Sequence, residues 1–236
     1  MAISLPIKPD ILMHFENGRS RDVYKYGDIN KANPPQFSLA NIHNKFGKSA
    51  ATFSVRLAFN HCIDTTKSFT LSYWIYDHDC ADQNQYLSFN REVGSLRAGL
   101  EFGWAYNGGY RVCCMSHNYT TSYDCDIRDS RVYPISQDAA VLIHLEFSFD
   151  STTKIFRIFR NGVIAWQQTL SFYIDNIAKN LALWPTATNT SLYIDELLLI
   201  QTCLHTAAFT PPAEPYIWLD GPRTAKDQNN KLYGYK

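Results

Sequence analysis

SLYIDELLLIQTCLHTAAFTPPAEPY, from Ser191 to Tyr216, is the stretch of sequence that decides the fold. It begins with an apolar run of strand length, Leu192 to Ile200, which carries an adjacent Asp–Glu pair in its middle. A short turn-like segment follows and leads into a proline-containing arm. The stretch therefore predicts a long last strand and an extended exit from the sheet.

The periodic signal in the rest of the chain has a repeat of two residues, as strands require. In SFTLSYWIY, Ser68 to Tyr76, alternate residues form two faces, and both are largely apolar. Lys154 to Thr169 predicts a hairpin, because Asn161-Gly162 tolerates the positive φ values of a type I′ turn. No stretch shows a sustained helical stripe. The predicted fold is all-β, a two-sheet antiparallel sandwich. Further strands are expected at 139–150 and 192–200, and a second tight turn is expected at 107–109.

Charge and hydropathy argue against several classes of protein. Lys plus Arg and Asp plus Glu number 22 each, so no net positive field attracts nucleic acid. No apolar stretch reaches the roughly 18 residues that a membrane span needs. The N-terminal MAISLPIKPD lacks the apolar run of a signal peptide. We therefore expect synthesis in the cytoplasm, and free, buried structural thiols for the six cysteines.

Several short motifs, taken in order, point to one family. LMHFENG (Leu12 to Gly18) precedes KFGKSAATF (Lys45 to Phe53), the two strand segments above come next, and YIDELLL…TAAFTPPAEPY ends the series. This order resembles the concanavalin A-like lectin/glucanase superfamily, in its laminin-G-like jelly-roll branch, and particularly the copies carried by bacteriophage virion and tail proteins. The resemblance covers roughly residues 11 to 216. It implies an extended segment at 1–10, a jelly-roll domain at 11–210 and a Pro-rich arm at 211–236.

The glucanases of this superfamily test the possibility of an enzyme. They use two glutamates that flank an aspartate at alternate positions of one strand, and retaining hydrolysis needs two carboxyls about 5 Å apart. Here Asp195 and Glu196 are adjacent, so we expect them to point to opposite faces, and no third acid follows. Glu101 and Glu146 each stand alone. We expect no catalysis, and a glycan-active hydrolase is the weaker alternative.

The resemblance also implies a metal position. Laminin-G-like domains often hold Ca²⁺ between the last strand and the N-terminal segment, with the aspartate of an IDE motif as a ligand. This implies a structural Ca²⁺ bound by Asp195 and Glu16, because calcium takes six to eight oxygen ligands. The alternative is that Asp195 accepts backbone amides at the sheet edge and Glu196 is a solvated strand residue.

The segment from Trp104 to Asp126 is the richest source of residues that could bind sugar. Aromatic rings stack on the apolar faces of sugars, and planar polar groups bind the hydroxyls. The alternative is that these rings pack a concave sheet. The expected carbohydrate-binding residues are Trp104, Tyr106, Tyr110, Arg111, Tyr119 and Tyr123.

The C-terminal arm combines four prolines with aromatic residues, which a plain linker would lack. It either folds back on the sandwich or docks on a neighbouring subunit, and we favour docking. The expected docking residues are Pro211, Pro212, Tyr216, Trp218, Tyr233 and Tyr235.

The resemblance as a whole implies a non-enzymatic bacteriophage virion structural protein, present in many copies as a capsid decoration or tail appendage. Its lectin-like sandwich would contact other virion proteins and host-surface polysaccharide. A purely architectural decoration protein without glycan binding is the alternative.

Overall fold

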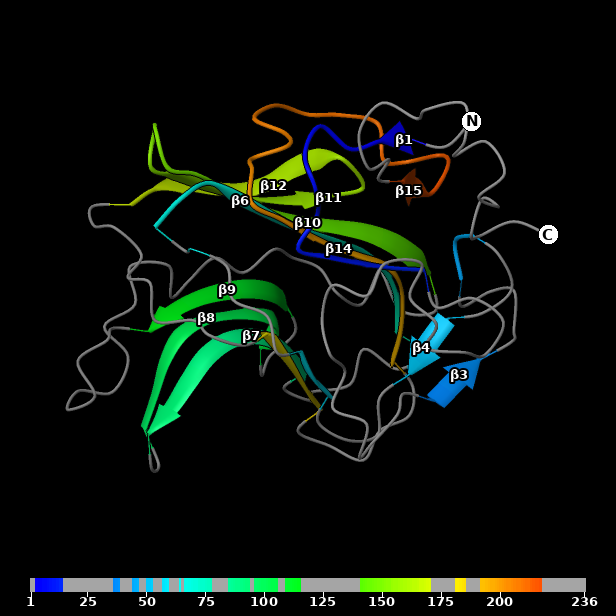
Figure 1. Cartoon of the computed structure of the whole chain (residues 1–236), viewed down its shortest axis with the longest axis horizontal. Helices are drawn as coiled ribbons and strands as arrows, with labels where there is room; N and C mark the ends of the chain where they lie inside the picture. Colours follow the sequence, from blue (N-terminus) through cyan, green and yellow to red (C-terminus); the bar gives the residue numbers. More distant parts are fainter. Residues whose placement is uncertain are drawn as a thin grey trace, which may run out of the picture.

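The computed structural model describes residues 3–14, 36–38, 44–46, 50–52, 57–59, 64, 66–77, 85–93, 96–105, 109–115, 141–170, 181–185 and 192–217. Within this part of the chain all regular structure is β, which confirms the predicted fold class. Figure 1 shows two sheets that lie one over the other, the larger above and the smaller below. No helix of membrane-spanning length and apolarity occurs in the described part.

The larger sheet contains the segments that the sequence marked as strands. Its outermost strand at one edge is β12, and β2 and β4 lie along the same side of β14. All pairs in it are antiparallel. The strands in order are β12 (Val163–Thr169), β11 (Ile155–Arg160), β10 (Leu142–Asp150), β6 (Phe69–Asp77), β14 (Leu192–Ile200), β4 (Ala50–Thr52) and β3 (Gln36–Ser38), with β2 (Ile11–Met13) beside β14.

The smaller sheet is also antiparallel throughout. In it β8 and β9 pair up to Ala105 opposite Gly109, as expected for strands joined by a tight turn. The five strands in order are β5 (Leu57–Phe59), β13 (Leu181–Pro185), β7 (Gln85–Val93), β8 (Leu96–Ala105) and β9 (Gly109–Met115). A third, parallel pair joins β1 (Ile3–Ser4) to β15 (Tyr216–Ile217), near the two ends of the described chain.

The hairpin of β11 and β12 forms where it was predicted. Asn161 has φ 50° and Gly162 has φ 77°, the left-handed pair that a type I′ turn requires. Beyond the turn the pairing register of β11 and β12 shifts by one residue: Phe159 lies opposite Ile164, whereas Ile158 lies opposite Trp166. Ala165 is thus an extra residue in β12. Such a bulge twists an edge strand and discourages pairing with another chain.

The main core lies between the two sheets. Every side chain of β6 from Phe69 to Tyr76 is buried, which confirms that both faces of this strand are covered. On the face toward the smaller sheet, Phe69 contacts the rings of Phe149 and Phe156, each at a centroid distance of 6.0 Å. Aromatic pairs at this separation add to the gain from buried area. The packing of these rings holds β6, β10 and β11 together.

The opposite, outer face of the larger sheet is covered by residues 201–217, here called the cover segment (Figure 1, orange). The Leu204 amide donates to Thr70 Oγ1 at 2.9 Å, and the Phe209 amide donates to the Gly162 carbonyl at 2.9 Å. A second apolar cluster lies beneath it. The cluster comprises Leu5, Leu12, Leu198, Ile200 and Tyr216, with Leu204 packed against it. The described arm therefore completes the sandwich.

Candidate functional site

Asp195 and Glu196 sit at a bulge in β14. Asp195 lies opposite Trp74 and Leu198 lies opposite Ser72, so two residues of β14 face one residue of β6. Glu196 takes φ 53°, which interrupts the alternation of the strand. Its backbone amide is held by Asp195 Oδ1 at 2.9 Å. The expectation that the two acids point to opposite faces is wrong. Asp195 lies opposite Trp74, whose ring contacts His144 on the outer side. Glu196 turns to His14 and Tyr216 on that same side.

Asp195 is fully buried and acts as an acceptor for backbone amides. Besides the Glu196 amide, its Oδ2 accepts from the amides of Lys45 and Phe46 at 2.8 and 3.1 Å. This is the amide-accepting role that the sequence left open as an alternative. Glu196 departs from that alternative, because it is buried and not solvated. Its carboxylate bonds to His14 Nδ1 at 2.6 Å.

The predicted calcium site cannot be assembled from what is described, since Glu16 lies outside the described residues. Within those residues, no cluster of three His, Cys, Asp or Glu side chains is arranged to hold an ion. Calcium at Asp195 stays a prediction.

We expect Asp195→Ala to lower the free energy of unfolding by about 3 kcal/mol, because three amide donors, one buried and two part-buried, lose their acceptor. Asp195→Asn should cost less, since its one remaining oxygen still accepts. Urea unfolding of both variants measures the difference. A loss for Asp195→Ala no larger than that for Asp195→Asn would contradict the amide-accepting role.

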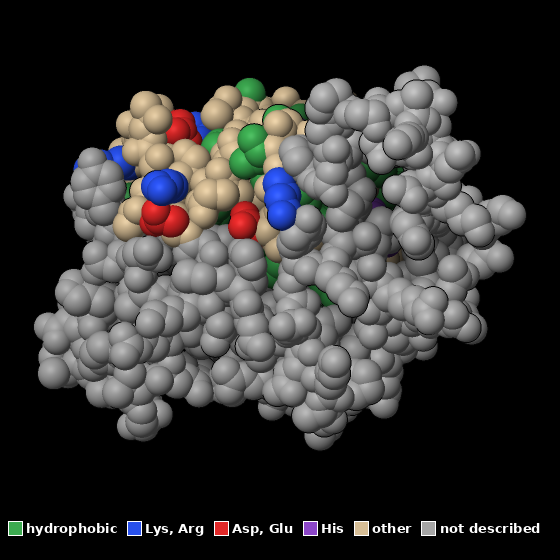
Figure 2. Space-filling model, viewed as in Figure 1, with side chains coloured by type: hydrophobic (Ala, Val, Ile, Leu, Met, Phe, Trp, Pro, Cys, Tyr) green, Lys and Arg blue, Asp and Glu red, His purple; other side chains and the backbone are tan. Residues whose placement is uncertain are grey.

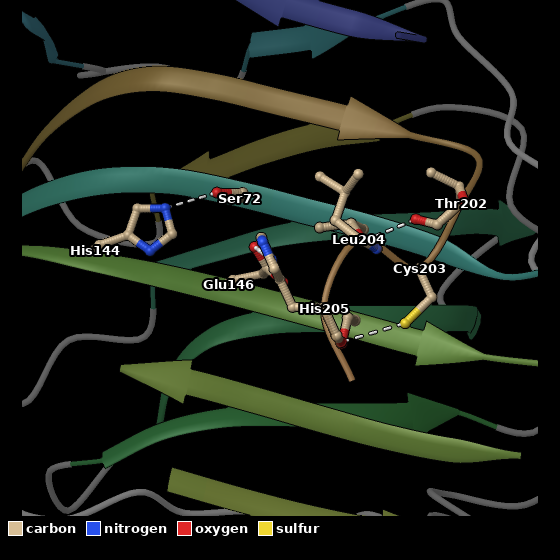
Figure 3. A network of polar contacts seen from close by, with 9 residues as sticks. Ser72, His144, Glu146, Thr202, Cys203, Leu204 and His205 are labelled. Atoms are coloured by element: carbon tan, nitrogen blue, oxygen red, sulfur yellow. Dashed lines mark hydrogen bonds and ion pairs between the residues drawn. The ribbon is translucent and has the colours of Figure 1, made fainter. Parts of the chain in front are cut away.

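Two buried carboxylates on the outer face each meet a histidine from a distant segment. Glu196 meets His14, and Glu146 Oε1 and Oε2 lie 2.9 and 3.0 Å from His205 Nδ1 (Figure 3). Burial raises the pKa of both glutamates, and the adjacent histidines counteract part of that rise. Each carboxyl is therefore held in a low-dielectric site with a single described ionic partner.

His144 lies two residues before Glu146 on β10 and is uncharged at neutral pH. Its Nε2 contacts Ser72 Oγ at 2.9 Å, as Figure 3 shows, and burial lowers the pKa of the imidazole to about 3. The Tyr216 side chain also bonds to Ser72, and burial raises the pKa of its hydroxyl. The network therefore joins β6, β10 and the cover segment through hydrogen bonds.

The expected sugar-binding residues are only partly covered by the structure. Trp104 on β8 lies directly opposite Tyr110 on β9, and Arg111 lies opposite Gly103. Directly opposed residues of an antiparallel pair share a face of the sheet, so positions 104 and 110 share one face and position 111 the other. Tyr106, Tyr119 and Tyr123 lie outside the described residues, as do the side chains of the strand positions.

Three of the expected docking residues lie in the cover segment, and the other three lie beyond it. Pro212 and Tyr216 are buried in the chain itself, and Pro211 is half-buried. Up to Ile217 the arm thus folds back on the sandwich, the outcome that the sequence left as the less favoured one. Trp218, Tyr233 and Tyr235 lie outside the described residues, so docking through them stays a prediction.

Sequence reasoning treated Glu146 as a lone acid and did not single out His14, His205 or Phe209. A signal for Glu146 was present, because it alternates with buried residues in HLEFSF and shares its face with His144 and Ser148. A polar row on a strand of this kind predicts either solvent or a polar covering segment. Only the structure shows that the covering segment is the chain's own arm.

No protein-family model and no curated protein matches the chain. Among solved structures, the binding domain of Paraclostridial Mosquitocidal Protein 1 aligns at TM-score 0.60 with 11% identity, over 84% of this chain and 49% of that one. The botulinum neurotoxin serotype D binding domain aligns at TM-score 0.57 with 11% identity, over 82% and 48%. The chain thus spans about half the length of these toxin domains.

A third structure is matched over nearly its whole length. Domain 4 of AbnA, a GH43 extracellular arabinanase from Geobacillus stearothermophilus, solved in complex with arabinotriose, aligns at TM-score 0.58 with 15% identity. The match covers 84% of this chain and 94% of that domain. At these identities the likeness concerns the fold alone. The chain has the β-sandwich fold of these three structures.

Proposed function

We propose that this chain is a non-enzymatic glycan-binding sandwich that a bacteriophage displays on its virion, as a capsid decoration or tail appendage. The observation that carries the glycan part is the likeness to the arabinanase domain, which matches over 94% of its length and was solved with arabinotriose. That domain, which is of similar extent to this chain, was thus solved with a short sugar chain bound.

The architecture restricts where a glycan could bind. One face of the larger sheet packs in the core, and the cover segment lies over β6, β10 and the turn between β11 and β12 on the other face. This favours the smaller sheet and the loops for recognition. Trp104 and Tyr110 are cross-strand neighbours there, and two aromatic residues at adjacent positions suit stacking on consecutive sugar rings.

The proposal that the chain is not an enzyme draws support from the burial of Glu146 and Glu196. They are 0% and 1% exposed and engaged with histidines, so neither carboxyl is open to a substrate in this structure. Glu101 lies opposite Ser88 and Cys113 in the register of the smaller sheet. No acid lies directly beside it across either strand, whereas a retaining hydrolase needs two carboxyls about 5 Å apart.

The virion assignment draws support from the YIDELLL…TAAFTPPAEPY ending and its resemblance to phage proteins. Figure 2 shows Lys, Arg, Asp and Glu side chains intermixed on the described part of one face, as a protein without nucleic-acid contacts would have. Its partners would be other virion proteins and host-surface polysaccharide, with the protein present in many copies. A structural Ca²⁺ at Asp195 and Glu16 belongs to the same proposal.

The test compares two tryptophan variants by calorimetric titration with a glycan that the wild-type chain binds. We expect Trp104→Ala to weaken binding about tenfold or more, because an aromatic stacking surface is lost. Trp166→Ala is the matched control, since Trp166 is half-buried on β12 of the other sheet. Equal affinities for Trp104→Ala and the control would contradict a site on the smaller sheet.

A further inference from the structure

The cover segment rests on the sheet through one titratable pair, His205 and Glu146. Glu146 on β10 has no exposed surface, and the two oxygens of its carboxylate lie 2.9 and 3.0 Å from His205 Nδ1. The His205 side chain is 28% exposed, so the solvent can deliver and remove a proton there. The pair therefore spans the boundary between the sheet and the cover segment (Figure 3).

His205 is also the residue on which the rest of the cover segment is organised. The ring of Phe209 stacks on its imidazole, with centroids 3.6 Å apart and planes 6° apart. The backbone carbonyl of His205 accepts from Ser148 Oγ at 3.3 Å and from Cys203 Sγ at 3.4 Å. A movement of His205 would thus move the segment on both of its sides.

The groups around Glu146 do not neutralise its charge by themselves. Tyr216 of β15 and Cys203 of the cover segment face it as uncharged hydroxyl and thiol groups, and burial raises the pKa of both. His144, two residues before it on β10, is neutral. Arg157 on β11 and Asp150 at the end of β10 act on Cys203 with opposite signs. Among the described residues, His205 is the ionic partner of Glu146.

We propose that a proton shared by His205 and Glu146 latches the cover segment onto the sheet, and that rising pH loosens it. With the proton, the pair is either a His⁺–carboxylate ion pair or two neutral groups, and no net charge is buried. Without it, a carboxylate charge is buried beside a neutral imidazole, which is costly in a low-dielectric site. Lifting the cover segment lets water solvate that charge and exposes the row of Ser72, His144 and Ser148.

The direction of the effect follows from proton linkage. Burial raises the pKa of Glu146 above its ordinary value of 4.5, so the closed form binds the proton more tightly than the open form. The proton's contribution to the closed form is lost as the pH rises through the raised pKa. In the open form a solvated imidazole keeps that proton up to its ordinary pKa of about 6.5, so opening releases a proton only above that pH, where it becomes up to about tenfold more favourable per pH unit.

Amide hydrogen exchange on the full chain tests the latch. The Leu204 and Phe209 amides bond across the cover boundary, to Thr70 Oγ1 and the Gly162 carbonyl. The Leu170 amide, which bonds to the Lys154 carbonyl within the hairpin, is the control. After correction for intrinsic exchange with reference peptides, we expect protection of the first two relative to Leu170 to fall by up to about tenfold per pH unit as the pH rises above about 6.5. A ratio that stays constant with pH overturns the proposal.

Two variants assign the effect to the pair. Glu146→Gln keeps an acceptor for His205 but cannot titrate, so the pH dependence of the protection ratio should disappear. His205→Asn keeps a donor but no titratable ring, and should lower protection of Leu204 and Phe209 at low pH while Leu170 is unchanged. A wild-type pH slope in folded Glu146→Gln contradicts the proposal. If Glu146→Gln does not fold, the response of His205→Asn decides.

Discussion

Gly162→Ala is expected to lower the free energy of unfolding by about 3 kcal/mol or more. Gly162 has φ 77°, where an L side chain is strained. Its Cβ would also collide with the Phe209 carbonyl oxygen and lie 2.9 Å from the Phe209 carbonyl carbon and from Pro211 Cδ. Because backbone atoms of the cover segment occupy this space, relief requires the segment to move and the Phe209–Gly162 hydrogen bond to weaken.

Urea denaturation of Gly162→Ala measures this effect. Val163→Ala is the control in the same hairpin, because Val163 is 62% exposed and its loss should change stability by no more than about 0.5 kcal/mol. A Gly162→Ala protein within about 1 kcal/mol of wild type would mean that the cover segment does not lie against the turn.

Phe147→Ala should cost about 4 kcal/mol, the middle of the range for deleting a buried aromatic ring. Phe147 on β10 is 0% exposed and lies opposite Leu71 of β6 and Ile158 of β11. Its ring stacks on that of Tyr73 with centroids 6.1 Å apart. Removal of the ring leaves a cavity at the centre of three strands, where the surrounding backbone has little freedom to collapse.

Phe147→Leu is the matched variant, since it retains most of the volume and should cost no more than about 1.5 kcal/mol. Thermal and urea unfolding of both proteins measure the gap. If the two substitutions have equal effects, Phe147 does not occupy a rigid core position between the sheets.

The strands could be predicted from the sequence because their information is local. Alternation over Ser68 to Tyr76 reports two covered faces, and Asn161-Gly162 reports the turn that joins β11 and β12. The bulge at Glu196 could not be predicted in this way. Glutamate has no special preference for the left-handed conformation that it takes, and the amides that fix Asp195 beside it come from residues about 150 positions earlier.

The candidate sites were harder to predict from the sequence than the strands were. A segment with proline and aromatic residues can pack on its own sheet or on a neighbour with the same chemistry, so composition does not decide between folding back and docking. The deciding information is long-range: Thr70 on β6, and Glu146 and Ser148 on β10, meet Leu204 and His205 in the cover segment. Such pairing depends on register and topology, which a single sequence does not specify.

The measurement that most directly tests the central claim is saturable binding of the purified chain to a glycan array, with and without a calcium chelator. The proposal predicts saturable binding to at least one polysaccharide, and loss of that binding on chelation if Ca²⁺ supports the fold near Asp195. A folded sample that binds no glycan in either condition would contradict glycan binding and would favour a purely architectural role in the particle.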